Sequence, residues 1–333
     1  GFTKQRYSGV RHKGTFLGIT EKAEYFKELG INQIKLMPAY EFTEMESVKT
    51  HARYRKEEEL PKRLNYWGYT KAFHFAPKRA YAATKDPVRE FKDMVKTMHR
   101  LGIEVLMEFY FPEGCSPRYI TECLQYWVQE YHVDGFILNP YNVPMDIILK
   151  DPILTGVRIL KHAEEYQNVM RRFLKGDEGV VTDVMYQTRK RWDLEGIYNC
   201  ITTHTGFTLK DLVSYDGKHN EANGENNQDG PDYNYSWNCG AEGLTRKKAV
   251  LELRKNQMRN ALFLLLLSQG VPCILAGDEF ANSQKGNNNV YCQDNPIGWL
   301  NWRNLLKEQE MYQFVKQLIK FRKKYRLFHQ EKE

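Results

Sequence analysis

Apolar positions follow two alternating patterns along the chain. Stretches with apolar residues every three or four positions are typical of amphipathic helices, and short continuous apolar runs are typical of buried strands. The predicted helices are 20–29, 87–101, 120–131 and 246–269, and the predicted strands are 34–37, 103–109, 135–138 and 271–276. This repetition predicts an α/β fold with a parallel sheet and favours a (β/α)8 TIM barrel over a doubly wound sheet.

Residues at the element ends agree with this pattern. Thr20 is a predicted N-cap, and Gly30 and Gly270 are predicted to end helices. The Asn- and Gly-rich stretch 216–240 is predicted to be one long loop at the mouth of the barrel, where the functional loops of such barrels lie. Because no linker is visible, residues 1–333 are interpreted as a single barrel domain.

Composition and charge exclude several classes of function. With 41% hydrophobic and 13% aromatic residues the chain can bury a substantial core. The net charge of +7 comes from interleaved charges without a basic stripe, so we expect no nucleic-acid partner. The most apolar run, Ala261–Leu267, is too short to span a membrane, and the first residues do not resemble a signal peptide. We therefore expect a cytoplasmic protein without a membrane partner.

The sequence signals no cofactor. The six cysteines are widely spaced without a zinc-ligand pattern, and no glycine-rich nucleotide motif follows a predicted strand. Asn287–Asn289 and the long loop are an alternative calcium site, but acidic ligands are sparse there. We expect no metal and no cofactor.

Many short motifs carry one resemblance. The longer ones are Asn65-Tyr66-Trp67-Gly68-Tyr69, Gly206-Phe207-Thr208-Leu209, Lys218–Glu225, Tyr235–Gly240, Ala276–Phe280 and Gly286–Asn289. Together they are similar to the glycogen-debranching, isoamylase and pullulanase enzymes of the α-amylase superfamily, glycoside hydrolase family 13. The resemblance implies a (β/α)8 barrel whose first strand should precede Gly1, so this strand is expected to be missing or truncated. The sixth strand has no clear counterpart in the sequence.

The resemblance also implies a chemistry. Retaining glycosidases need a carboxylate nucleophile and a carboxylic acid about 5–5.5 Å apart. The family places its three carboxylates at the ends of strands four, five and seven, where this chain has Asn139, His162 and Thr205. No catalytic carboxylate is therefore expected to be intact.

Aromatic and polar residues of the matched loops are candidates for sugar binding, because an aromatic face offers a flat apolar platform. They are Tyr66, Trp67, Tyr69, His204 and Trp237, and the alternative is that the aromatic rings only hold loops together. Three functions stay open. The first is a catalytically inactive homologue that binds α-glucan oligosaccharide or polysaccharide or regulates an active debranching enzyme. The second is a glycoside hydrolase or transglycosylase on α-1,6 or α-1,4 glucans with rewired catalytic residues, for which Glu108 and Glu113 are a candidate carboxylate pair; we favour the alternative that Glu108 is a hydrogen-bonded structural acid and Glu113 a solvated one. The third is a remnant that binds nothing.

Overall fold

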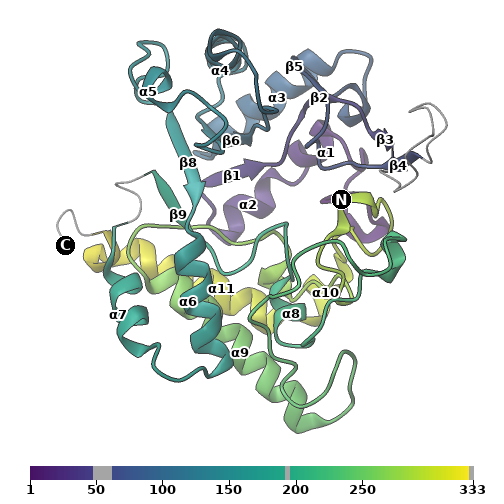
Figure 1. Ribbon diagram of the computed structural model, residues 1–333, viewed down its shortest axis with the longest axis vertical. Helices are drawn as coiled ribbons and strands as arrows, with labels where there is room; N and C mark the ends of the chain where they lie inside the picture. Colours follow the sequence, from purple (N-terminus) through teal and green to yellow (C-terminus); the bar gives the residue numbers. More distant parts are fainter. Residues whose placement is uncertain (48–61, 192–195, 330–333) are drawn as a thin grey trace.

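The main sheet of the computed structural model contains six parallel strands in the order β1-β6-β7-β8-β9-β10. The structure describes residues 1–47, 62–191 and 196–329. The strands are β1 (Gln33–Leu36), β6 (Glu104–Glu108), β7 (Gly135–Ile137), β8 (Arg158–His162), β9 (Ile197–Asn199) and β10 (Val271–Pro272). The sheet curls into a partial barrel with β1 and β10 at its edges (Figure 1). The predicted α/β barrel architecture is confirmed, in an incompletely closed form.

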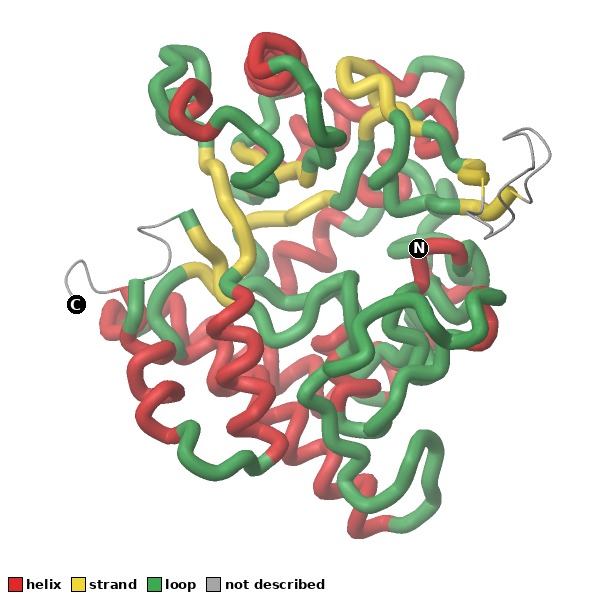
Figure 2. The backbone as a smooth tube through the Cα atoms, in the orientation of Figure 1, coloured by secondary structure: helices red, strands yellow, loops and turns green. Residues whose placement is uncertain are grey.

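Helices cover the outside of the curled sheet (Figure 2). They are α1 (Phe16–Thr20), α2 (Ala23–Leu29), α3 (Pro87–Arg100), α4 (Pro117–Tyr131), α5 (Met145–Ile148), α6 (Glu164–Lys175), α7 (Val181–Arg189), α8 (Leu209–Leu212), α9 (Lys248–Leu267), α10 (Arg303–Lys307) and α11 (Gln309–Lys324). One core, which includes Phe91, Trp127 and Phe136, joins α3 and α4 to the first strands. A second core, which includes Tyr166 and Leu265, joins α6, α9 and α11.

A smaller cluster fills the inside of the curled sheet. It contains Leu106, Ile137, Tyr198 and Cys200. Side chains two residues apart in a strand share a face, so Glu108 lies on the same inner face as Leu106. The register pairs Lys35 with Leu106, which also places Lys35 on this face. A lysine and a glutamate of neighbouring strands are thereby brought together inside the sheet.

Two antiparallel hairpins interrupt the chain between β1 and α3. β2 (Tyr40–Phe42) pairs with β5 (Ala72–Pro77), and β3 (Met45–Ser47) pairs with β4 (Lys62–Leu64). The segment 65–71 connects β4 to β5 and lies beside the carboxyl end of β1 (Figure 1). The hairpins therefore carry the matched motif 65–69 to the mouth of the sheet.

One predicted helix start is wrong. Thr20 ends α1 instead of capping a helix, and α2 begins only at Ala23. Thr15 is the N-cap that the structure shows, because its side chain accepts a hydrogen bond from the Gly18 amide at 3.1 Å. Gly30 ends α2 with a φ of 93°, as predicted for a C-terminal glycine.

The remaining predicted elements are found with shifted ends. The helix predicted over 246–269 is α9, which ends two residues earlier, before Ser268. The strand predicted over 271–276 is the two-residue β10. Between β8 and β9 the described residues form α6 and α7 and no further strand. β8 therefore pairs directly with β9, and no strand for the family's sixth position lies between them in the described chain.

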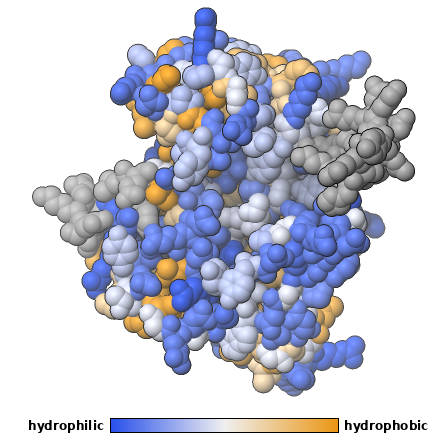
Figure 3. Space-filling model, in the orientation of Figure 1, coloured by the Kyte–Doolittle hydropathy of each residue, from blue (hydrophilic) through white to orange (hydrophobic). Residues whose placement is uncertain are grey.

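The surface in Figure 3 is mostly hydrophilic. Hydrophobic residues gather over the part of the upper layer that holds α4 and α5. Exposed apolar side chains there include Ile147, Leu149 and Ile153. No described helix is both long and apolar enough for a membrane-spanning segment.

Candidate functional site

The carboxyl ends of the parallel strands meet at one edge of the sheet, which we call the barrel mouth. In barrels of this type this edge carries the functional residues. Glu108 and His162 are the last residues of β6 and β8, and Asn139 follows β7 by two residues. His204 lies in the segment after β9. Four strands thus bring polar side chains to the barrel mouth.

A hydrogen-bonded network occupies its centre. Lys35 Nζ lies 2.9 Å from Glu108 Oε2 and 3.0 Å from the Tyr198 hydroxyl. The Tyr69 hydroxyl lies 2.6 Å from Glu108 Oε1 and 2.7 Å from His204 Nε2. The Lys35 and Glu108 side chains are only 20% and 16% exposed, so each charge depends on the other for compensation.

The charges of the pair are reinforced by their surroundings. Burial is the largest single effect and opposes ionisation of Glu108, but Lys35, His204 and the Tyr69 hydroxyl together outweigh it and hold the pKa of Glu108 below its usual value. Burial likewise opposes the charge of Lys35, and the Glu108 carboxylate raises the pKa of Lys35 well above its usual value. Both groups are therefore ionised at neutral pH.

His204 is neutral in this environment. Burial lowers the pKa of His204 to about 4, although the Glu108 carboxylate acts in the opposite direction. The Tyr69 hydroxyl has one proton, which it donates to Glu108 Oε1. The Tyr69 oxygen must then accept its second hydrogen bond, so His204 Nε2 carries the proton and donates. This arrangement fixes the tautomer and orientation of the imidazole.

The three residues at the matched carboxylate positions are all exposed. Asn139 Oδ1 accepts a hydrogen bond from the Tyr141 amide at 3.1 Å, and Thr205 Oγ1 lies 3.1 Å from Thr203 Oγ1. His162 is close enough to Lys35 for the ammonium charge to act on its ring. In the described structure none of these three side chains forms a hydrogen bond with the network.

The candidate aromatic residues divide into two groups. Trp67 is 6% exposed, and its ring meets those of Tyr69 and His204 edge-on, with centroids 6.2 Å and 5.0 Å away. Tyr66 is half-buried, and its hydroxyl lies close to Gly298. Trp237 packs against the second core. The structure therefore brings Trp67, Tyr69 and His204 together and leaves Trp237 outside this cluster.

Gly68 allows the backbone turn that places Trp67 and Tyr69 beside each other. It has a φ of 85°, which favours glycine, and a Cβ built there would lie 2.6 Å from Pro38 Cβ. The backbone therefore passes tightly over Pro38 while Trp67 and Tyr69 take their places on either side of Gly68. The loop between β4 and β5 depends on this close approach.

Sequence reasoning missed Lys35 and Tyr198. The available signal was a lysine within the apolar run 34–37, because a charge in a buried strand needs a partner. Nothing in the sequence named Glu108 as that partner, since 73 positions separate the two residues and the strand register joins them.

Three other buried acids hold loops together. Asp278 accepts a hydrogen bond from the Leu209 amide at 2.9 Å and is bonded to the Thr202 hydroxyl. Glu279 accepts from the Tyr25 hydroxyl at 2.5 Å, and Asp211 accepts from the Ser283 hydroxyl at 2.5 Å. Burial raises the pKa of Asp278 to about 7.

The asparagines of the long loops bond to one another. Asn288 Nδ2 donates to the Pro231 carbonyl at 2.8 Å, and Asn220 Nδ2 donates to Asn288 Oδ1 at 2.8 Å. Within the described ranges, no group of three His, Cys, Asp or Glu side chains is placed to hold a metal ion. These amides stabilise the loop ends against each other.

The chain matches no family model, but it is similar to several plant and bacterial proteins. Isoamylase 1, chloroplastic, of Arabidopsis thaliana is 33% identical over 440 residues, covering 97% of this chain and 55% of the relative. Isoamylase 1 of Oryza sativa subsp. japonica is 31% identical over 439 residues, covering 97% and 53%. The glycogen operon protein GlgX homolog of Haemophilus influenzae is 32% identical over 407 residues, covering 93% and 60%. The chain thus spans little more than half the length of these relatives.

The alignments also show an internal difference. The alignment with the rice isoamylase is 439 residues long, whereas this chain has 333 residues. The relative therefore contains residues that have no counterpart in this chain. A shortened barrel, in which β8 pairs directly with β9, agrees with such a difference.

Solved pullulanases have the same fold. The enzyme from Paenibacillus barengoltzii, complexed with maltohexaose and alpha-cyclodextrin, has a TM-score of 0.73 at 20% identity and covers 98% of this chain and 62% of its own. Type I pullulanase of Bacillus subtilis, complexed with maltose, has a TM-score of 0.73 at 20% identity, with 98% and 56% covered. At this identity the likeness establishes the fold alone. The sequence similarity to isoamylases and glycogen operon proteins, and the barrel fold shared with pullulanases, agree with the resemblance that the motifs predict.

Proposed function

We propose that this chain binds α-glucan oligosaccharides or polysaccharides and does not hydrolyse them. The names of its relatives and the maltooligosaccharides in the related pullulanase structures support the glucan as ligand. The proposed binding partner is a carbohydrate, and the sequence predicts neither a nucleic-acid nor a membrane partner and a cytoplasmic location. An active debranching enzyme is the protein partner that such a chain would regulate.

The observation that carries the proposal is the bonded state of Glu108. Retaining hydrolysis needs one carboxylate free to attack and one carboxylic acid free to give a proton. Glu108 is ionised, bonded to Tyr69 and paired with Lys35, so it has neither a proton to donate nor freedom to attack. The Glu108 carboxylate therefore serves an internal ion pair and hydrogen bond instead of a reaction with substrate.

The neighbouring positions do not replace it. An amide at Asn139 cannot form the glycosyl ester of a retaining mechanism, and neither His162 nor Thr205 supplies a carboxylic acid. Loss of a nucleophile alone costs on the order of a millionfold in turnover in a well-studied hydrolase. Glu113, the second acid of a rewired enzyme, is exposed in the turn after β6. We therefore favour binding over rewired catalysis.

The barrel mouth retains groups that suit a sugar. Asn139, His162 and Thr205 offer exposed polar side chains, and saccharide hydroxyls are both donors and acceptors. The Tyr69 ring is partly exposed beside them. Hydroxyl groups of a glucan are expected to bond to these side chains while the buried ion pair stays closed.

Isothermal titration with maltoheptaose and a branched limit dextrin, followed by product analysis of the same mixtures, tests the proposal. We expect a saturable heat and unchanged saccharides. His204→Ala should weaken binding, because it removes the imidazole that orients Tyr69. His99→Ala is the matched control, since His99 is an exposed histidine paired with Asp134 away from the barrel mouth. New products that disappear in Glu108→Gln would instead establish a rewired hydrolase.

A further inference from the structure

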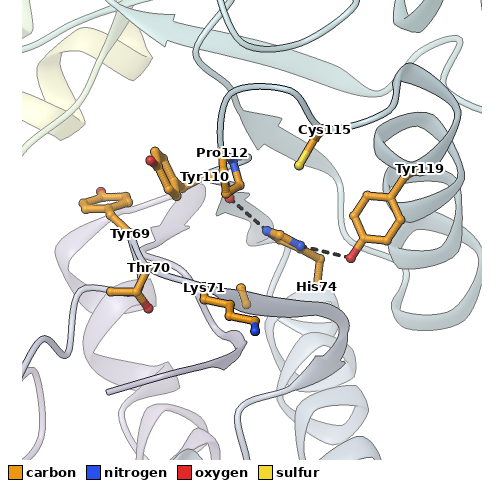
Figure 4. A pocket seen from close by; sticks show the side chains of 9 residues that line it. Tyr69, Thr70, Lys71, His74, Tyr110, Pro112, Cys115 and Tyr119 are labelled. Atoms are coloured by element: carbon orange, nitrogen blue, oxygen red, sulfur yellow. Dashed lines mark hydrogen bonds between the residues drawn. The ribbon is translucent and has the colours of Figure 1, made fainter. Parts of the chain in front are cut away.

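A second concave site lies beside Tyr69 and the segment that follows β6. It is an open cavity of about 440 Å³ between the start of β5 and the turn that leads into α4 (Figure 4). Small-molecule sites usually have volumes of about 300–1,000 Å³. The residues around it include Tyr69, Lys71, His74, Tyr110, Cys115 and Tyr119. The cavity therefore has the size of a ligand site, and three tyrosines and His74 form the aromatic part of its wall.

His74 fixes the orientation of this wall. Its Nε2 lies 2.9 Å from the Tyr110 carbonyl oxygen, which can only accept, so Nε2 carries the proton (Figure 4). Burial lowers the pKa of His74, which keeps the ring neutral. Nδ1 is then an acceptor, and the Tyr119 hydroxyl donates to it at 3.1 Å. The Tyr119 oxygen consequently faces its surroundings as a hydrogen-bond acceptor.

Aromatic rings continue from the cavity along the protein surface. The Phe75 ring lies 5.5 Å from that of Tyr119 and 5.4 Å from that of Tyr126, measured between centroids. Phe75 and Tyr126 are both 36% exposed, and Phe73, on the same face of β5, is 63% exposed. The rings of Tyr119, Phe75 and Tyr126 thus form a row that starts at the cavity wall, whereas Phe73 lies on the face of β5 opposite to the cavity residues Ala72 and His74.

We propose that this cavity and its row of rings form a second α-glucan-binding site, which adjoins the barrel mouth at Tyr69. The inference rests on the proposed function and adds the place of a further contact. A glucose ring presents apolar C–H faces to aromatic rings and hydroxyls to acceptors such as the Tyr119 oxygen. A chain of such rings matches a row of aromatic side chains better than a compact ligand does.

The side chains around the cavity disfavour other ligand classes. The one charged side chain among its lining residues is Lys71, and neither a carboxylate nor an arginine lines it. A divalent cation would find no acidic ligand there. A polyphosphate would find one exposed lysine and no cluster of cations. A neutral, hydroxyl-rich ligand fits the lining better than either ion.

Tyr69 connects the two sites. Its hydroxyl is held in the network with Glu108 and His204, while the same residue lines the cavity. One glucan bound across Tyr69 would contact both sites, and two glucan segments would share this residue as a common wall. The second site is therefore expected to extend the length of glucan that the protein binds.

Cys115 allows a direct test, since it lines the cavity as a free, partly exposed thiol. The rate of its alkylation by iodoacetamide is measured by mass spectrometry with and without maltoheptaose, and partly exposed Cys292 is the internal reference. At a saccharide concentration about ten times Kd, the rate at Cys115 should fall about tenfold. The rate at Cys292 should not change.

Variants separate this inference from the proposed function. Tyr119→Ala should raise the Kd for maltoheptaose about fivefold by removing an aromatic platform, and Tyr186→Ala, an exposed tyrosine on α7, should leave it unchanged. If maltoheptaose binds while Cys115 stays fully reactive and Tyr119→Ala binds normally, the second site is refuted and the proposed function stands. If the unaltered protein does not bind maltoheptaose, both are refuted.

Discussion

The buried pair of Lys35 and Glu108 predicts that neither charge tolerates the loss of its partner. In Lys35→Met the side chain keeps its length, but the Glu108 carboxylate, 16% exposed, loses the ammonium at 2.9 Å. Removing one member of a buried pair typically costs about 3–5 kcal/mol, because the remaining charge stays desolvated. We expect a loss of this size in the free energy of unfolding at pH 8.

The destabilisation caused by Lys35→Met should depend on pH in a defined direction. In the unaltered protein the folded-state pKa of Glu108 is below its ordinary value of 4.5, so its contribution to stability is present above about pH 4.5 and lost as the pH falls. Lys35→Met removes the strongest of the effects that oppose burial, so this pKa should rise and protonation should relieve the unpaired charge. The variant should therefore lose less stability at pH 5 than at pH 8.

Urea unfolding followed by tryptophan fluorescence at both pH values measures these differences. Glu108→Gln and the double variant complete the cycle, and the double variant should cost less than the sum of the single ones. Lys92→Met is the matched control, since Lys92 and Glu130 form a pair with side chains 40% and 43% exposed and should contribute less than about 1 kcal/mol. Additive effects, or a cost for Lys35→Met as small as for Lys92→Met, would refute the reasoning.

Three further predictions follow from other buried groups. Burial raises the pKa of Asp278 to about 7, so its contribution to the free energy of unfolding is complete below about pH 4 and is lost as the pH rises to 7, by at most roughly 4 kcal/mol. Asp278→Asn should flatten this pH dependence in urea unfolding. An unchanged dependence of stability on pH would contradict the prediction. The His204 ring should titrate near pH 4 by NMR, because burial favours its neutral form, and a midpoint near 6.5 would exclude the assigned network. Arg254 on α9 donates hydrogen bonds to the carbonyls of Ser214, Asn238 and Gly243. Arg254→Met should therefore speed proteolysis within 214–243. Equal cleavage rates in the variant and the unaltered protein would show that these bonds do not hold the loop.

The sequence predicted the periodic part of the fold better than its irregular part. Helices such as α3 and α9 were found because their apolar spacing extends over many turns. The apolar pattern does not predict β8, since it has charged or polar residues at three of five positions; the family resemblance alone placed His162 at the end of a strand. Its place depends on pairing with β7 and β9, which no local pattern encodes.

The candidate site shows the same division. The motif 65–69 and His204 were named from the sequence, and the structure brings Trp67 and Tyr69 to His204. Glu108 was predicted as a hydrogen-bonded structural acid, but its partners were not, because they depend on the register of β1 against β6 and on a tyrosine in the segment after β4. Tertiary contacts of this kind decide whether a carboxylate is a reactive group or a structural one.

The most direct test of the central claim is one calorimetric titration of the protein with maltoheptaose, after which the contents of the cell are separated by chain length. We predict a saturable heat of binding and maltoheptaose of unchanged length after prolonged incubation. The absence of binding heat would contradict glucan binding. Shorter oligosaccharides that accumulate in proportion to protein concentration, and not with Glu108→Gln, would contradict the assignment of Glu108 to a closed ion pair.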